Sequence, residues 1–595
     1  MLDRQKSDLL LLAFVFLAAL AFIAIRAYYN GFDQVFFADN DDAMRMVVVR
    51  DFLSGQNWFD HAQYRMNTPF GADMHWSRLV DLPIAIVELL ARPLVGPAQA
   101  EIVAGYVWPS ILLAVFIWLS GRLARLMVGA EGVLPGMLLS AFSIITFSEF
   151  NFGRVDHHSV QIILTQIAAI ATITALRRPG AAIGAGLAVA TSLAIGIETL
   201  PVVVAAIVIY GLIYVASPGH ARAVRNFGLS FGLGTLVHMG IALPPSLWFV
   251  PACDAISLVY VTAALAVGAG LSGLTLLPLG NRPWPWRLAA AAIVGAAALT
   301  LVLVLFPHCL AGPYASVDPW LVEHWLSGVG EAKPLREVLS EQPSYVMGAA
   351  IPATLALLVY AYAAWRTRGV ERGGWLVMLA FLVFIAAVAL LQVRGVRLSV
   401  AVLSPACGYL VVAARTRYLR KATPLSVLGL IGSWLGFVGL LWAVLVQQIV
   451  VHLPAHIPAR AMSSAEVDRG PCLAPGAFVD LKGMPPERIM TPIDLGAYVL
   501  LYTDHAVVAA PYHRNNQGLL DTFHFFNGPI GEARAILDAR GISLVVTCDA
   551  LPEMTGLPDA APDAFVHLAR ANALPAWLTE VKHDGPLRIY AVLPQ

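Results

Sequence analysis

Long apolar stretches recur along the first three quarters of the chain, and they constrain its fold more than any other feature. A stretch of roughly 18 or more apolar residues can cross a bilayer as one helix. Soluble chains carry about a quarter charged residues, whereas here the share is 13% of 595 residues. The sequence therefore predicts a polytopic all-α membrane protein of about 13 transmembrane helices. The expected spans lie at about 7–25, 102–120, 132–148, 159–176, 181–197, 199–216, 224–243, 254–278, 286–306, 346–365, 374–392, 398–414 and 425–451.

Basic residues fall in every second connection between these spans, and they predict the orientation. Positively charged loops stay on the cytoplasmic side, which places the N-terminus inside and the loops 27–101, 149–158 and 307–345 outside. An odd number of crossings also leaves the C-terminus outside. We expect a multi-pass protein of the bacterial inner (plasma) membrane. The basic connections contain Arg122, Arg125, Arg177, Arg178, Arg222, Arg225, Arg282, Arg287, Arg366, Arg368, Arg372, Arg415, Arg417, Arg420 and Lys421.

The last quarter of the chain, 453–595, has the composition of a soluble domain. Segments 506–510 and 541–547 read as buried strands, and 531–539 reads as a helix between them. We therefore expect a transmembrane domain over 1–452 and a small extracytoplasmic α/β domain over 453–595. Cys472 and Cys548 could pair there if that side is oxidising. The formal net charge of zero gives no indication of a nucleic-acid partner.

The polar segment between the expected spans 132–148 and 159–176 contains Arg154, Asp156, His157 and His158. Charged groups at a membrane boundary are costly unless they pair tightly or perform chemistry. Asp156 and His158 offer two metal ligands from one short turn, and Arg154 can bind an anion. A polar loop that merely caps two helices explains the same residues, so this segment alone leaves both interpretations open.

Acidic residues recur in two other loops on the same side. Asp39, Asp41 and Asp42 occupy three of four consecutive positions just beyond the first span. Such carboxylates repel one another unless a cation is present, although a solvated helix cap also favours Asp. Glu331 lies in a glycine-flanked stretch of the 307–345 loop, where it could move to meet a ligand. The alternative for Glu331 is an ordinary solvated loop acid.

Two arginines, Arg394 and Arg397, break the charge rule because they lie at an outer helix end. Arginine at this place is costly unless it meets an anion. A diphosphate is a suitable partner because it can accept bidentate hydrogen bonds. The alternative is that both side chains reach the phosphates of membrane lipids.

Taken in order, these motifs resemble those of the single-subunit oligosaccharyltransferases of bacteria and archaea, which belong to the GT-C glycosyltransferases. Asn40-Asp41 followed by Arg50-Asp51 resembles the first acidic motif of that family, and Asp156-His157-His158 resembles its second. Val329-Gly330-Glu331 is similar to the motif of the mobile fifth external loop, and Arg397 to the arginine that contacts the donor diphosphate. The layout of about 13 spans and an outer C-terminal domain is also similar, so the resemblance covers nearly the whole chain.

The resemblance implies a glycosyltransferase that moves a sugar or oligosaccharide from a polyprenyl-diphosphate-type lipid donor to an acceptor on the outer face. It implies Mg²⁺ or Mn²⁺ as cofactor; oxygen ligands suit a hard ion, and an imidazole shifts the balance towards Mn²⁺. Asp41 or Glu331 would also act catalytically by orienting the acceptor. The implied metal ligands are Asp41, Asp156, His158 and Glu331. The implied diphosphate-binding residues are Arg397, Arg394 and Arg154.

The chain departs from this family at the acceptor site. The Trp-Trp-Asp motif that recognises the acceptor sequon is absent, and its nearest counterpart, 491–496, keeps Asp494 but neither tryptophan. The acceptor, whether a polypeptide, a glycan or a lipid, therefore stays open. A transporter or flippase for a glycolipid or another solute is the alternative function. Transporters place acids near the bilayer midplane and show paired repeats, whereas here the acids cluster at outer helix ends.

Overall fold

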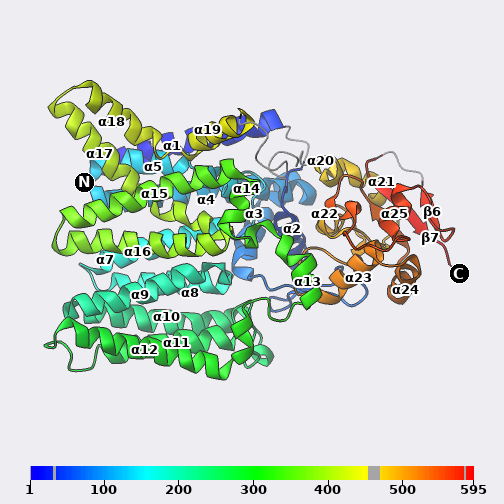
Figure 1. The fold of residues 1–595 in the computed structure, drawn as a ribbon, viewed down its shortest axis with the longest axis horizontal. Helices are drawn as coiled ribbons and strands as arrows, with labels where there is room; N and C mark the ends of the chain where they lie inside the picture. The colour runs from blue at the N-terminus through cyan, green and yellow to red at the C-terminus, as the bar shows by residue number, and fades with distance from the viewer. Residues whose placement is uncertain (1, 31–34, 453–468, 582–584, 595) are drawn as a thin grey trace.

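The computed structural model describes residues 2–30, 35–452, 469–581 and 585–594. A bundle of long helices forms one part of the molecule and an α/β domain the other (Figure 1). Within the described residues, seven helices are each long and apolar enough to cross a membrane, or up to nine spans if two bent pairs are counted. The seven are α1 (Leu2–Asn30), α4 (Pro97–Val128), α7 (His158–Ala175), α9 (Leu200–Ala216), α12 (Trp284–Leu305), α15 (Pro343–Arg366) and α16 (Gly369–Leu391).

The other expected spans are helical too, but they are bent, shorter or more polar. Two pairs bend by 53° and 92°: η8 (Val393–Val402) with α17 (Ser404–Arg420), and α18 (Pro424–Leu435) with α19 (Gly439–His452). The remaining ones are α5 (Val133–Ala141), α6 (Ile144–Glu149), α8 (Ala181–Ile195), α10 (Ala221–Ala242) and α11 (Leu258–Leu274). The polytopic helical class is thus confirmed, and the number of 13 crossings stays a prediction. Short 3-10 turns join these helices: η1 (Ala130–Gly132), η2 (Ile197–Thr199), η3 (Pro218–His220) and η4 (Pro245–Leu247).

Small residues let neighbouring helices of the bundle approach closely. A Cβ atom on Gly228 of α10 would lie 2.9 Å from the carbonyl oxygen of Gly268 in α11. One on Gly232 would lie 3.1 Å from the carbonyl oxygen of Ala264. Close backbone contact of this kind stabilises helix pairs in membranes, where apolar burial contributes little to association.

The expected outer loops are largely ordered. The first contains α2 (Asn40–Leu53), the strands β1 (Ala62–Gln63) and β2 (Ala72–Asp73), and α3 (Arg78–Val95). α3 exposes a row of leucine and isoleucine side chains at helical spacing, which suits a helix lying on a membrane surface: Leu82, Ile86, Leu89, Leu90 and Leu94. The 307–345 loop contains η5 (Pro307–Ala311), α13 (Pro319–His324), η6 (Leu326–Gly328), η7 (Gly330–Ala332) and α14 (Leu335–Glu341).

A five-stranded sheet of order β4-β3-β5-β7-β6 forms the centre of the C-terminal domain. β3 pairs in parallel with β4 and β5, and β7 pairs antiparallel with β5 and β6. The expected strands and helix coincide with β4, β5 and α24, although β4 has only two residues. The strands are β3 (Arg488–Met490), β4 (Ala506–Val507), β5 (Leu544–Thr547), β6 (Leu578–Val581) and β7 (Arg588–Val592). The helices are α20 (Gly470–Leu473), η10 (Pro475–Phe478), α21 (Val479–Lys482), α22 (Ile493–Tyr502), α23 (Asn516–Asn527), α24 (Ile530–Arg540), η11 (Pro552–Thr555) and α25 (Phe565–Arg570).

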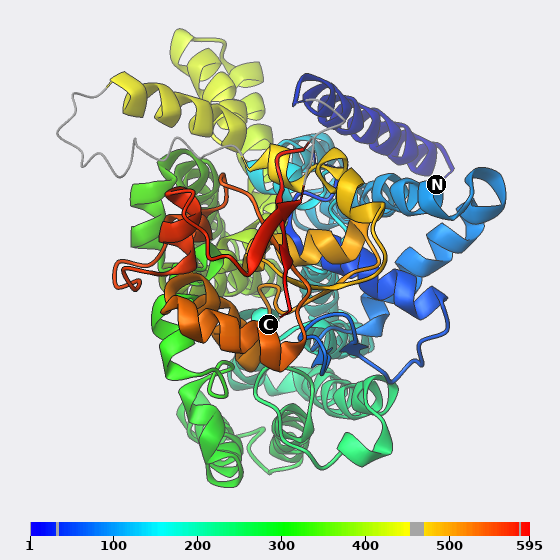
Figure 2. The same ribbon diagram turned by 90° about the vertical axis from the view of Figure 1, so that its right-hand side faces the viewer.

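The C-terminal domain packs directly on one end of the bundle, here called the domain-facing end; the opposite end is called the far end. Figure 2 looks onto this domain, with the bundle behind it. Arg50 of α2 donates to the carbonyl oxygen of Leu501 at 2.9 Å, and Arg65 donates to that of Leu500 at 2.9 Å. α13 adds an apolar contact, with Leu321 packed in one cluster with Phe523. The expected domain boundary at 453 lies outside the described residues.

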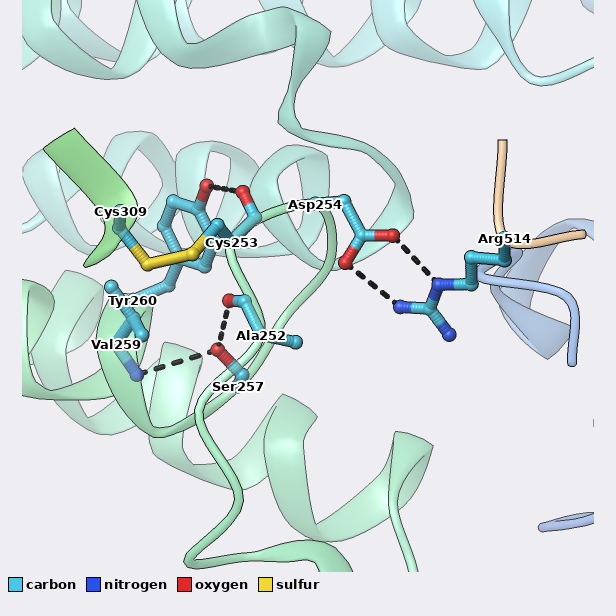
Figure 3. Close-up of a disulfide and its surroundings, with 8 residues drawn as sticks. All are labelled: Ala252, Cys253, Asp254, Ser257, Val259, Tyr260, Cys309 and Arg514. Atoms are coloured by element: carbon cyan, nitrogen blue, oxygen red, sulfur yellow. Dashed lines mark hydrogen bonds and ion pairs between the residues drawn. A yellow bond between two sulfur atoms is a disulfide. The ribbon is translucent and has the colours of Figure 1, made fainter. Parts of the chain in front are cut away.

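Two disulfides are present. Cys472 pairs with Cys548 inside the C-terminal domain, as the sequence suggested. The second, Cys253–Cys309, was not anticipated; it ties the connection before α11 to η5 (Figure 3). Next to it, Asp254 accepts two hydrogen bonds from Arg514 of the C-terminal domain, at 2.6 and 2.9 Å. The disulfide therefore restrains the connection whose next residue, Asp254, contacts the C-terminal domain.

Candidate active site

The first turn of α2 forms one wall of a polar cluster at the domain-facing end. Asp39 caps this helix, since its side chain accepts the backbone N–H of Asp41 at 3.1 Å. A carboxylate at this place also interacts favourably with the helix dipole. The capping interpretation is therefore confirmed for Asp39, while Asp41 and Asp42 have different surroundings.

Asp42 fixes the segment that carries Asp156. Its carboxylate is fully buried and accepts the backbone N–H groups of Val155 at 2.9 Å and Asp156 at 3.0 Å. It also accepts a hydrogen bond from Arg154 at 2.8 Å. Burial raises the pKa of Asp42 to about 7, against the opposing charge of Arg154. α2 thereby sets the position of the Asp156 segment.

Asp156 is the centre of a compact set of ligand-type side chains. Its Oδ1 lies 2.6 Å from Nδ1 of His157, and its Oδ2 lies 3.2 Å from Nε2 of His158. One ligand atom from each of these three residues lies within 4.8 Å of the others. Burial disfavours a charged imidazole, but Asp156 and Glu198 outweigh it and raise the pKa of His157 to about 10. Glu198 lies 3.6 Å from His157 Nε2 and so belongs to the edge of the site.

Arg45 is a member of this cluster that sequence reasoning missed. It donates to Asp81 at 2.9 Å and to Asp156 at 3.3 Å, and its side chain is 1% exposed. The guanidinium lies over the ring of Trp76, 4.2 Å from its centroid. Arg78 also binds Asp81, at 3.3 Å. The sequence signal that could have found this network is the run of charged residues in and around Asn40–Leu53 of the 27–101 loop, together with Arg78 and Asp81.

Glu331 joins the same region from the 307–345 loop through Arg397. Arg397 forms ion pairs with Glu331 and with Glu149, the latter at 3.2 Å. Glu149, the last residue of α6, is a second residue that sequence reasoning missed. Burial disfavours ionisation of Glu331, but the charges of Arg397 and His158 outweigh it and lower the pKa of Glu331 to about 2. Glu331 is therefore a carboxylate at neutral pH.

Asp41 interacts electrostatically with both Asp156 and Glu331. Burial, followed by the negative charges of Asp156, Asp39 and Glu331, raises its pKa well above the ordinary value. The two acids Asp41 and Glu331 line one cavity of about 620 Å³, which extends to the C-terminal domain. The cluster within 4.8 Å comprises Asp156, His157 and His158, and Asp41 and Glu331 flank it.

The three arginines expected to bind a diphosphate all lie near the cluster, and all have protein partners. Arg154 binds Asp39 at 2.9 Å in addition to Asp42. Arg394 donates to the side chain of Gln392 at 2.8 Å and to the hydroxyl of Tyr314 at 3.3 Å. Arg397 keeps one buried nitrogen, Nη1, without a hydrogen-bond partner.

Asp494 also lines the 620 Å³ cavity, from the first turn of α22. It accepts hydrogen bonds from Arg469 at 2.8 Å and from Asn40 at 3.4 Å. Its backbone N–H donates to Glu553 at 2.9 Å. Burial, followed by repulsion from Asp494, raises the pKa of Glu553 to about 7. The C-terminal domain thus brings a pair of acids to the same cavity as Asp41.

The donor set of the cluster fits a divalent cation. Oδ2 of Asp156 is buried and accepts no hydrogen bond within the described residues, its contact being the ion pair with His158 at 3.2 Å. Buried polar atoms of this kind are uncommon unless a ligand or ion satisfies them. Carboxylate oxygens suit Mg²⁺ or Mn²⁺, and the imidazole of His158 shifts the balance towards Mn²⁺. The repulsion among Asp41, Asp156 and Glu331 would also be relieved by a positive ion.

The chain matches no protein-family model and no curated protein, but it is similar to solved structures of the oligosaccharyltransferase AglB from Archaeoglobus fulgidus. With the complex that holds an inhibitory peptide and a dolichol-phosphate, it shares 12% identity and a TM-score of 0.65, over 91% of this chain and 70% of the archaeal one. With the apo form it shares 11% identity and a TM-score of 0.65, over 92% of this chain and 70% of the archaeal one. With the form tethered to a peptide containing the NVT sequon it shares 12% identity and a TM-score of 0.60, over 97% of this chain and 74% of the archaeal one. The chain therefore has the oligosaccharyltransferase-like GT-C fold.

Proposed function

We propose that this chain is an integral-membrane glycosyltransferase. It would transfer a sugar or oligosaccharide from a polyprenyl-diphosphate-type lipid to an acceptor at the domain-facing end, assisted by Mg²⁺ or Mn²⁺. The observation that carries the proposal is the buried cluster of Asp156, His157 and His158 together with a cavity that Asp41 and Glu331 line, in three separate segments of a strongly apolar chain. Asp41 and Glu331 both interact electrostatically with Asp156. The fold shared with the archaeal oligosaccharyltransferase supports it, since structures of that protein hold a dolichol-phosphate and an acceptor peptide.

A bound cation would supply positive charge to stabilise the diphosphate leaving group. The residues that would hold it are Asp41, Asp156, His158 and Glu331. His157 would act beside them by keeping Asp156 in place, because its Nδ1 lies 2.6 Å from the Asp156 carboxylate. Arg45 fixes the same carboxylate from the other side at 3.3 Å.

The transfer exchanges one bond at C1 of the sugar. The acceptor atom bonds to C1 and gives up its proton to the carboxylate of Asp41, the C1–O bond to phosphate breaks, and the diphosphate leaves with the electron pair. Arg397 would bind this anion, because its unpartnered Nη1 can donate to a phosphate oxygen while Glu149 keeps the guanidinium in position. Fixed donors of this kind stabilise developing charge without reorganisation.

The acceptor would enter the 620 Å³ cavity between the bundle and the C-terminal domain. Asp41 lines this cavity and would orient the nucleophile by accepting its hydrogen bond. Asp494, which lines the same cavity, offers a second acceptor of hydrogen bonds, although Arg469 and Asn40 already use it. The candidate acceptors are a polypeptide, a glycan and a lipid hydroxyl.

The alternative, a transporter or flippase, requires polar groups along a path through the bundle. The acids of the site instead lie where helices begin or end. Glu149 is the last residue of α6, Asp156 precedes α7 and Glu198 precedes α9. This arrangement favours chemistry at one membrane surface.

The proposal is tested by deleting the gene from the source cells and comparing glycoproteins, glycans and glycolipids by mass spectrometry. We expect one glycan class to disappear and to return with the wild-type chain but not with Asp156→Ala. Asp549→Ala is the matched control, because it removes a carboxylate from the C-terminal domain outside the site, and it should restore the glycan. An unchanged glycan profile in the deletion strain would reject the proposed function.

A further inference from the structure

A second cavity, of about 680 Å³, opens at the far end of the bundle. It lies among the last turns of α4 and α7, the first turns of α16 and the middle of α17. α7 begins in the active site at His158 and has 18 residues, so its two ends are about 27 Å apart at 1.5 Å per residue. This far-end cavity is therefore separate from the catalytic cluster.

Three arginines line the far-end cavity: Arg122, Arg177 and Arg178. Within the part of the chain that the structure describes, their guanidinium groups form no ion pair and no hydrogen bond. The guanidinium of Arg122 lies over the ring of Trp118, 5.9 Å from its centroid. Glu371 is the sole acid on the lining, so the cavity carries an excess of positive charge.

Aromatic and apolar side chains complete the lining. Trp375 is 3% exposed and lies edge-on to Tyr409, with ring centroids 5.3 Å apart. Leu126, Val370 and Val412 line other parts of the wall. The cavity thus combines guanidinium groups with an apolar wall next to helices that are apolar enough to lie in lipid.

We propose that this cavity binds the phosphate group of an anionic membrane phospholipid. Guanidinium groups recognise phosphate oxygens through paired hydrogen bonds, and basic pockets between helix ends are suited to lipid head groups. An inorganic phosphate ion would satisfy the same arginines. The apolar wall favours the lipid, because it offers contact to the glycerol and upper acyl segments that a free ion lacks.

The test uses the full chain purified in a zwitterionic detergent, with phosphatidylglycerol, phosphatidylcholine or inorganic phosphate added. Binding is followed by native mass spectrometry and by the shift of the unfolding temperature. The pocket variant replaces Arg122, Arg177 and Arg178 by Gln. The matched control replaces Arg222, Arg417 and Arg420 by Gln, three exposed arginines of the same end that do not line the cavity.

We expect the wild type and the control to bind phosphatidylglycerol with equal affinity, and the pocket variant to bind it on the order of a hundredfold more weakly, since each arginine near a lipid surface contributes about 1 kcal/mol. Val370→Trp provides a second test that keeps all charges, because a large side chain at the rim should block the lipid even if the triple variant does not fold. Equal binding of phosphatidylglycerol by wild type and Val370→Trp would overturn the proposal, as would an equal loss in the control. A shift with inorganic phosphate as large as that with the lipid would overturn the assignment to a lipid.

Because the cavity is remote from the active site, its test is independent of the glycosyltransferase proposal. Loss of lipid binding in the variants would support the lipid site even if the deletion strain showed no change in its glycans. Retained lipid binding would reject the site and leave the proposed activity unaffected.

Discussion

Arg397 forms an ion pair with Glu331, and this contact joins the domain-facing end of the bundle to the 307–345 loop. The same guanidinium contacts Glu149 at 3.2 Å. While Glu331 is paired with Arg397, the positive guanidinium weakens the attraction between the Glu331 carboxylate and a cation. We infer that a donor diphosphate would compete with Glu331 for Arg397, which would release the carboxylate towards the cation site.

Replacing Arg397 by Ala should therefore raise the KM for the lipid-linked donor. The loss of one hydrogen bond to a charged group costs about 1.5–3 kcal/mol, so a rise of roughly tenfold or more is expected. Turnover at limiting donor is the measurement. Arg336→Ala in α14 is the control, because that side chain is 84% exposed and distant from the cluster's ion pairs. Unchanged turnover of Arg397→Ala at limiting donor would show that the arginine has no role in donor binding.

Asp42→Asn should destabilise the segment that carries Asp156. The substitution removes the charge that pairs with buried Arg154 and replaces one acceptor oxygen by an amide group. Breaking a buried ion pair on one side costs about 3–5 kcal/mol. Thermal unfolding of the detergent-solubilised protein should show a lower midpoint than for Asp73→Asn, an exposed acid of β2. Equal midpoints for the two variants would contradict the structural role of Asp42.

The sequence was sufficient to predict the helical membrane class and the local motifs, but not the contacts between distant segments. Asp156 and His158 could be recognised because two residues in one turn are necessarily close. Arg45 could not, since its partners Asp81 and Asp156 lie 36 and 111 positions away. The Cys253–Cys309 disulfide joins two connections whose proximity depends on how α11 and α12 pack.

The Cys472–Cys548 disulfide should stabilise the C-terminal domain. It closes a segment of 76 positions between two buried cysteines, and a cross-link of this length typically contributes about 2–4 kcal/mol by restricting the unfolded chain. Replacing both cysteines by Ser should lower the unfolding midpoint of the full chain. A reducing agent should then lower the midpoint of the wild type more than that of the variant. An equal effect of the reducing agent on both would argue against this contribution.

The stability of the contact between the bundle and the domain should fall on acidification. Burial, followed by the charges of His513 and Arg514, lowers the pKa of His75 to about 3, whereas an unfolded chain has a histidine pKa of about 6.5. The folded state therefore holds His75 neutral. Its contribution to the free energy of unfolding is complete above about pH 6.5 and is lost as the pH falls towards 3. The ring of His75 lies 4.7 Å from that of His513, so the loss should weaken this interface.

His75→Gln should make the unfolding midpoint less dependent on pH over that window. The measurement compares the unfolding midpoints of the wild type and the variant at two pH values. pH 7.5 lies just above the window and pH 5 lies inside it. His452→Gln, at the exposed end of α19, is the control and should keep the wild-type slope. A variant slope equal to that of the wild type would assign the pH dependence to other groups.

The fold is similar to that of an oligosaccharyltransferase, but the residues around Asp494 lack the tryptophans of a sequon-binding motif. A pair of tryptophans beside an aspartate can form a pocket for a sequon hydroxyl, but Asp494 is preceded by Pro492 and Ile493, and its carboxylate is already bound by Arg469 at 2.8 Å. Losing large aromatic contacts typically costs about 2–4 kcal/mol, which is roughly a hundredfold or more in affinity. We therefore expect little transfer from a lipid-linked donor of the source cells to a peptide containing Asn-Val-Thr, and no difference from the same peptide with Asn replaced by Gln. Efficient transfer to the first peptide and none to the second would show that other residues of the 620 Å³ cavity recognise the sequon in place of the tryptophans.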